Sequence, residues 1–99
     1  MAQRYDIILS SQLGERYGSL LLEEDAGRVT GTISLLGFDN PASGKRSGQR
    51  LELVHELRTA VSTLQCRTEL ALCGGRLHGM VSSGHGVMEL RGEKAAGAA

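Results

Sequence analysis

The chain has 99 residues, a length that suits a single small domain. Its 11 basic and 11 acidic side chains give a net charge of zero, so the protein offers no electrostatic field to attract a nucleic acid or an anionic membrane. No apolar stretch approaches the roughly 20 residues that span a bilayer, and we expect neither a nucleic acid nor a membrane as a partner.

The cysteines and the N-terminal segment favour a cytoplasmic protein with reduced thiols. Cys66 and Cys73 are seven residues apart. Within one strand, an odd spacing places them on opposite faces, where they cannot bridge each other. The first residues, MAQRYDIILSS, lack the charged segment and long apolar run of a signal peptide.

Glycine-rich turn signals recur about every ten residues, which is the spacing of an all-β meander. The chain has 14 glycines and one proline. Apolar and polar residues alternate between the turns, a pattern typical of strands with one buried face. In chain order the expected strands lie within 5–11, 18–24, 28–35, 40–48, 50–59, 63–72, 76–82 and 86–92.

The fourth of these segments, NPASGKRSG, is the weakest strand candidate. Pro41 removes a backbone donor, which predicts an edge strand or a loop. The surrounding GFDNPASGKRSG superficially resembles a phosphate-binding glycine loop, yet six residues separate Gly37 from Gly44 instead of four. Arg46 also stands where a serine or threonine would bind magnesium. We therefore interpret the stretch as a solvated loop.

The segment RLELVHELRT, Arg50–Thr59, fits either a helix or a strand. An internal repeat favours the strand: GRVTGTIS begins at Gly27 and GRLHGMVS begins at Gly75, 48 residues later. This offset maps Leu53 onto Tyr5 in the first half of the chain. The segment that contains Tyr5 is a poor helix, so its copy at Arg50–Thr59 is better explained as a strand. Two copies of a four-stranded meander would account for the repeat.

The strand interpretation predicts a register in which one inward row crosses three strands. A four-residue turn at Ala60–Thr63 and a two-residue turn at Gly74-Gly75 fix the register. The predicted pairs are Leu57–Cys66, His55–Thr68, Leu53–Leu70, Leu72–Leu77, Leu70–Gly79 and Thr68–Val81.

Closing the sheet would hide the edges of such a meander. We predict one all-β domain over residues 1–94, an antiparallel up-and-down meander of about eight strands that forms a small barrel or a half-open barrel. A disordered Ala/Gly tail follows at 95–99. Gly31 and Gly79 lie mid-strand, where a barrel could bend sharply.

The order of strands and turns over residues 4–92 resembles the meanders of lipocalins, fatty-acid-binding proteins and streptavidin. The resemblance is one of rhythm only. Lipocalins carry a Gly-x-Trp motif near the first strand and streptavidin lines its site with tryptophans, whereas this chain has no tryptophan. No binding residue of these families is therefore carried over.

His55 is the most informative inward residue, because it would lie beside Thr68 among leucines, with Tyr5 on the corresponding inward row. It is either a neutral core histidine bonded to Thr68, or the polar anchor of a small apolar ligand inside the barrel. The first interpretation suits a packed core. The second makes the protein a carrier with a ligand site at these three residues.

The outer face carries apolar residues on nearly every expected strand, and together they would mark an interface. They are Ile8, Leu21, Val54, Ala71, Met80 and Val87. Since symmetric dimers are the commonest oligomers, we predict a homodimer that works by protein association.

No catalytic, metal or cofactor motif emerges. The chain has no nucleophile elbow or zinc-protease motif. His78 would pair with Arg91 on the outer face while His85 sits at a turn, too far away to share a metal. We expect a non-enzymatic protein without cofactor or metal.

Overall fold

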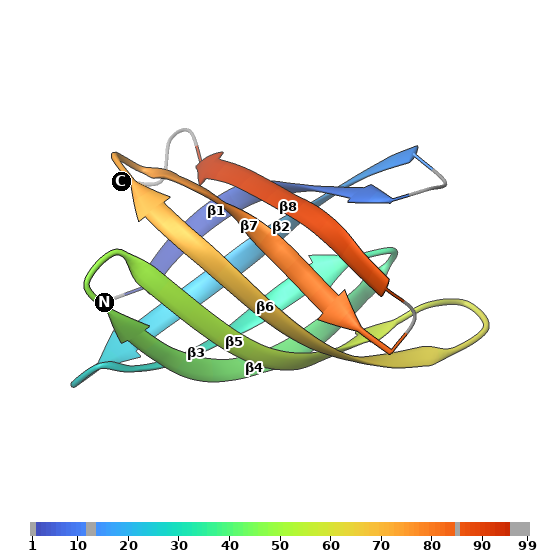
Figure 1. Cartoon of the computed structure of the whole chain (residues 1–99), viewed down its shortest axis with the longest axis horizontal. Coiled ribbons are helices and arrows are strands. Elements are labelled where there is room, and N and C mark those ends of the chain that lie inside the picture. The colour runs from blue at the N-terminus through green and yellow to red at the C-terminus, as the bar shows by residue number, and fades with distance from the viewer. Residues whose placement is uncertain (1, 12–13, 85, 96–99) are drawn as a thin grey trace.

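The computed structural model describes residues 2–11, 14–84 and 86–95, which form a closed barrel of eight antiparallel strands joined in chain order (Figure 1). The strands are β1 (Ala2–Ser11), β2 (Gly14–Asp25), β3 (Arg28–Leu35), β4 (Phe38–Ser47), β5 (Arg50–Arg58), β6 (Thr63–Cys73), β7 (Arg76–Ser83) and β8 (Gly86–Lys94). The predicted all-β meander is confirmed, and it is a closed barrel. Of the predicted tail, only Ala95 falls within the described residues.

The barrel closes where β8 pairs with β1. The ladder runs from Tyr5 opposite Lys94 to Ser10 opposite Glu89. At its end the backbone N–H of Ala95 donates to the carbonyl oxygen of Arg4 at 2.9 Å, so this residue is fixed against β1. Each of the eight described strands therefore has a partner on both sides, which removes the open edges that promote aggregation.

Side chains at alternate strand positions point inward and fill the barrel, as expected for eight strands. The largest fully buried apolar side chains are Ile7, Leu9, Leu20, Ile33, Leu51, Leu53, Leu77 and Leu90. Three polar side chains, Asn40, His55 and Thr68, are buried among them. Within the described residues, every buried side-chain nitrogen and oxygen has a hydrogen-bond partner, so the polar groups are compatible with a packed core.

The two halves of the chain repeat each other at an offset of 48 residues. At this offset β3 coincides with β7, and Leu22 opposite Gly31 corresponds to Leu70 opposite Gly79. The offset also reproduces the register of the other hairpins within each half. The predicted pair of four-stranded repeats is thus present in the geometry.

The two joints between the halves are not equivalent. Ser43 lies opposite Val54 in the β4–β5 joint. At the 48-residue offset Ser43 corresponds to Arg91 and Val54 corresponds to Asp6. Arg91, however, lies opposite Ile8 in the β8–β1 joint. The closing joint is therefore shifted by two residues relative to the internal one.

The predicted register between β5 and β6 is wrong by two residues. The observed pairs are His55–Cys66, Leu57–Leu64 and Leu53–Thr68. The turn comprises Thr59–Ser62 because the Thr59 N–H donates to the Ser62 carbonyl oxygen at 2.8 Å, while its hydroxyl accepts from the Ser62 N–H at 3.0 Å. A two-residue shift leaves every side chain on its face, so the inward row stands as predicted.

The predicted loop or edge around Pro41 is also wrong, because β4 is a full strand between β3 and β5. The ladder to β5 starts only at Ala42, next to the proline. The buried Asn40 amide contacts both neighbouring strands: its oxygen accepts from the Arg58 N–H of β5 at 3.0 Å, and its nitrogen donates to the Ile33 carbonyl oxygen of β3 at 3.0 Å. The side chain of Asn40 thereby supplies a hydrogen bond between β4 and β5 in the part that their ladder does not cover.

Inward-facing glycines allow neighbouring backbones to approach closely. A Cβ on Gly31 would overlap the carbonyl oxygen of Leu21, and one on Gly79 would overlap that of Glu69. These two contacts are equivalent at the 48-residue offset. Both predicted bend positions thus need glycine because a backbone occupies the place of a side chain.

Candidate functional site

His55 and Thr68 meet inside the barrel, although they are not directly opposite in the ladder. The His55 Nδ1–H donates to the Glu56 carbonyl oxygen at 3.0 Å, since a carbonyl can only accept. Nε2 then accepts from the Thr68 hydroxyl at 2.6 Å. This pattern assigns a neutral imidazole of one tautomer. Tyr5 lies apart from this pair, and its hydroxyl donates to Gln3 Oε1 at 2.9 Å.

Little empty space surrounds the histidine. The cavity beside it has a volume of about 10 Å³, which is room for about one water molecule. Its lining consists of Leu9, Ile33, Leu35, His55, Leu57, Thr68, Val81 and Leu90. In this structure the interior around His55 is therefore filled by the protein's own side chains.

Burial changes the acid–base properties of two neighbouring residues. Burial lowers the pKa of His55, and the hydrogen bond to Glu56 only partly opposes this effect. Burial raises the pKa of the Cys66 thiol, which lies opposite His55. Cys66 is buried and Cys73 is exposed, as their odd spacing predicted, and both are free thiols.

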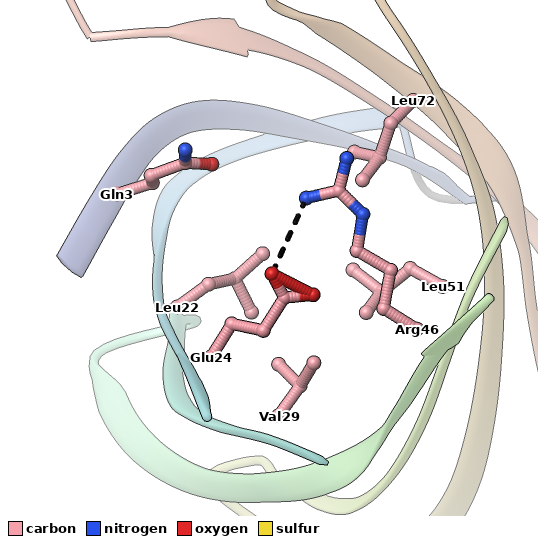
Figure 2. Close-up of a pocket in the computed structure, with 7 residues that line it drawn as sticks. All are labelled: Gln3, Leu22, Glu24, Val29, Arg46, Leu51 and Leu72. Carbon is pink, nitrogen blue, oxygen red and sulfur yellow. Dashed lines mark ion pairs between the residues drawn. The ribbon is translucent and has the colours of Figure 1, made fainter. Parts of the chain in front are cut away.

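A larger pocket of about 170 Å³ occupies one open end of the barrel (Figure 2). It lies at the end where β2 turns into β3 and β4 turns into β5. Its lining consists of Gln3, Leu22, Glu24, Val29, Arg46, Leu51 and Leu72. The four apolar members form the floor, because each is almost fully buried.

Three polar side chains surround the opening of this pocket. Figure 2 shows the Arg46 guanidinium extending across it toward the Glu24 carboxylate, with Nη1 and Oε2 3.8 Å apart. Arg46 Nε donates to the Gly48 carbonyl oxygen at 3.0 Å, which holds the guanidinium at one side. Gln3 faces the opening from β1, and its side-chain oxygen accepts a hydrogen bond from the Tyr5 hydroxyl.

Sequence reasoning missed this pocket. Gln3 continues the inward row of Tyr5, and Glu24 continues that of Leu22, so strand alternation alone indicates that both point inward. The interpretation of GFDNPASGKRSG as a solvated loop gives the Arg46 side chain no inward position. A full strand from Phe38 to Ser47 would have placed it on the inward face as well.

The outer face has two wide hollows that share His78. One of about 680 Å³ spans β2, β1, β8 and β7 and is lined by Ile8, Tyr17, Arg76, His78, Arg91 and Glu93, among others. The other, of about 550 Å³, is lined by Arg50, Glu69, Ala71, His78, Met80 and Val87, among others. The predicted pairing of His78 with Arg91 is confirmed. His85 lies outside the described residues.

The predicted interface residues do not all share one surface. Ile8, Met80 and Val87 line the hollows of β1, β7 and β8. Leu21 is exposed between Arg4 and Thr32, outside both hollows. Val54 is exposed on β5 and is likewise outside them.

Among the described residues, no group of three or more histidine, cysteine, aspartate or glutamate side chains could hold a metal ion. No helix long and apolar enough to cross a membrane occurs in that part of the chain either.

Comparisons with known proteins show the fold alone. No protein-family model matches the chain, and no curated protein matches it. Among solved structures, the chain is similar to a redesigned β-barrel, mFAP1, bound to DFHBI, with a TM-score of 0.72 and 4% sequence identity. The match covers 94% of this chain and 93% of that chain. The protein is thus an eight-stranded β-barrel with fold-level likeness to a ligand-bound barrel.

Proposed function

We propose that the protein is a non-enzymatic β-barrel module that associates with a second copy of itself. The surface that supports this proposal is the hollowed face, which we define as the outward residues Ile8, Tyr17, His78, Met80 and Val87. Tyr17, Met80 and Val87 are exposed large apolar side chains. Apolar side chains grouped around a concave surface favour burial against a partner.

The charges around the hollowed face favour a second copy as the partner. Arg76 pairs with Glu93 at 3.7 Å, and Arg91 pairs with Glu89 at 3.6 Å. A two-fold axis brings one surface against itself, so a surface carrying both signs can place opposite charges together. The net charge of zero adds no overall repulsion between two copies.

The experiment replaces matched residues inside and outside the hollowed face. Met80 and Leu21 are 46% and 41% exposed, and Val87 and Val54 are 59% and 56% exposed. We expect Met80→Lys and Val87→Lys to weaken self-association by about tenfold or more, because a buried unpaired lysine costs more than 1.4 kcal/mol. Leu21→Lys and Val54→Lys are the controls. Sedimentation velocity over a range of concentrations measures the association.

Wild-type protein that stays monomeric at high concentration contradicts this function. Equal loss of association in all four lysine variants contradicts the hollowed face as the contact surface. Far-ultraviolet circular dichroism of each variant establishes that any loss of association is not a loss of the barrel.

A carrier of a small apolar ligand, with His55, Thr68 and Tyr5 at its site, is the second candidate. The similarity to a redesigned barrel bound to DFHBI favours it. The cavity of about 10 Å³ beside His55 and the separate position of Tyr5 weigh against it. Self-association is therefore the stronger proposal.

A further inference from the structure

Two pairs of repeat-equivalent positions in the open-end pocket differ in polarity. Gln3 and Glu24 line the pocket in the first half of the chain. Their equivalents at the 48-residue offset, Leu51 and Leu72, line the same pocket from the second half. Equivalent positions thus differ in polarity within one pocket, and its polar opening above an apolar floor suits a ligand with a polar end and an apolar end.

The charged pair at the opening is separated enough to accept other partners. The Arg46–Glu24 distance of 3.8 Å is longer than the roughly 2.7–2.9 Å of a charge-assisted hydrogen bond. By comparison, Arg91 and Glu15 on the outer surface are 2.6 Å apart. Arg46 and Glu24 therefore keep hydrogen-bonding capacity, and both point into the opening (Figure 2).

The pocket volume limits the apolar part of a ligand. Its volume of about 170 Å³ is close to the ~150 Å³ of an apolar cavity that accommodates benzene. The floor formed by Leu22, Val29, Leu51 and Leu72 therefore has room for a group the size of one large side chain. A long acyl chain or a multi-ring compound would extend out of the barrel.

We propose that the open end binds a free apolar α-amino acid as its zwitterion. The ligand carboxylate accepts hydrogen bonds from the Arg46 guanidinium, and the ligand ammonium donates to the Glu24 carboxylate. The apolar side chain lies on the floor near Leu51 and Leu72. The Gln3 amide nitrogen supplies a further donor toward the ligand carboxylate, because the Gln3 oxygen already accepts the Tyr5 hydroxyl.

A zwitterion fits this opening better than a simple carboxylate or a simple amine. A carboxylate on Arg46 without an ammonium would lie near the negative Glu24, and an amine on Glu24 without a carboxylate would lie near the positive Arg46. Each arrangement brings like charges together. A ligand with both groups matches both partners and adds no net charge to the opening.

The test is a nuclear magnetic resonance titration of the full chain with three compounds that share a carbon skeleton. L-Leucine has both charged groups, 4-methylpentanoate lacks the ammonium, and 3-methylbutylamine lacks the carboxylate. We expect leucine to shift amide signals around the open end and to bind at least tenfold more tightly than either analogue. A charge-assisted hydrogen bond lost from a partly buried site accounts for about this factor.

Two variants and one control test the roles of the charged residues. Arg46→Gln should weaken leucine binding about tenfold or more. Glu24→Gln should weaken leucine binding but strengthen 4-methylpentanoate binding, a reversal that damage to the fold cannot produce. Arg76→Gln breaks an outer ion pair of similar length, 3.7 Å, and should leave leucine binding unchanged. The signal dispersion of each variant verifies its fold.

Several results would overturn the proposal. They are no leucine-induced shifts up to the solubility limit, equal binding of the three compounds, unchanged leucine binding in Arg46→Gln, or shifts that map to the hollowed face. The site is independent of self-association, so Met80→Lys should bind leucine like the wild type. Failure of the dimer and failure of this site are thereby distinguished.

Discussion

At the scale of single residues, His55 introduces a titratable imidazole into a core of leucines. Because burial lowers its folded-state pKa below the ordinary value of about 6.5, the unfolded chain takes up the proton more readily. The free energy of unfolding should therefore fall as the pH drops from about 6.5 toward that lower pKa. Above this window His55 is neutral in both states and contributes no pH dependence.

We predict that His55→Leu reduces the fall in stability between pH 7 and pH 5.5. At pH 8 the free energy of unfolding of the same variant should be about 1–3 kcal/mol lower than that of the wild type, because the Thr68 hydroxyl is left buried without its acceptor. Urea denaturation at several pH values measures both effects. Cys66, the titratable residue opposite His55, stays protonated in this range because burial raises its pKa.

The control for this prediction adds Thr68→Val to His55→Leu, which removes the unsatisfied hydroxyl. The double variant should recover part of the stability lost at pH 8 and keep the reduced pH dependence. A pH dependence as steep in His55→Leu as in the wild type would show that another group causes it.

The contact between His55 and Thr68 was predictable from the sequence, whereas the ion pair between Glu24 and Arg46 at the open end was not. Alternation along β5 and β6 places His55 and Thr68 on the inner face whichever of the two registers applies. The ion pair of Glu24 and Arg46 depends on how long side chains from distant strands extend across an opening. Strand periodicity identifies the face of such residues, but not which of them meet.

At the scale of strands, inward glycines allow the neighbouring backbone to approach. We predict that Gly79→Ala destabilises the protein by about 3 kcal/mol or more, at the upper end of overpacking effects, because its Cβ would overlap the Glu69 carbonyl oxygen. Gly84→Ala is the matched control, since a Cβ there meets no atom within 4 Å. The midpoints of urea denaturation compare the two variants.

Gly31→Ala should behave like Gly79→Ala, because its Cβ would meet the equivalent carbonyl oxygen of Leu21. If Gly79→Ala were as stable as Gly84→Ala, the backbone at this point would have to move freely, and the close approach would have no structural role.

The strands themselves were largely predictable, and the errors have local causes. Turn glycines and alternation identified six strands, the internal repeat identified β5, and the inner faces were correct. The β5–β6 register failed because hydrogen bonds of Thr59, rather than a glycine, define that turn. The fourth strand was underestimated because the amide of Asn40 bridges its neighbours beside Pro41, and a propensity argument does not include that contact.

At the scale of the whole molecule, the start of β1 and the residue that follows β8 meet at one end of the barrel. The hydrogen bond from Ala95 to Arg4 at 2.9 Å brings them together. We predict that a circular permutant, with residue 95 joined by a short linker to residue 2 and the chain opened between Gly48 and Gln49, folds to the same barrel. New termini are tolerated at exposed turns. Circular dichroism and urea denaturation measure the outcome.

A permutant opened between Thr30 and Gly31, inside β3, is the control and should not fold, because it interrupts ladders on both sides. If the Gly48–Gln49 permutant also did not fold, the β8–β1 joint could not serve as an internal hairpin, even with residues 95 and 2 joined by a linker.

The β8–β1 joint also has a consequence for the order of folding. Seven of the eight strand pairs join neighbours along the chain, whereas the eighth brings Tyr5 to Lys94. Closing so long a loop costs roughly 3 kcal/mol more in chain entropy than closing a four-residue turn, at about 0.6 kcal/mol per doubling of length. Contacts between distant residues form slowly for the same reason. The hairpins should therefore form first and ring closure last, so that β1 and β8 stay open strand edges until the final step.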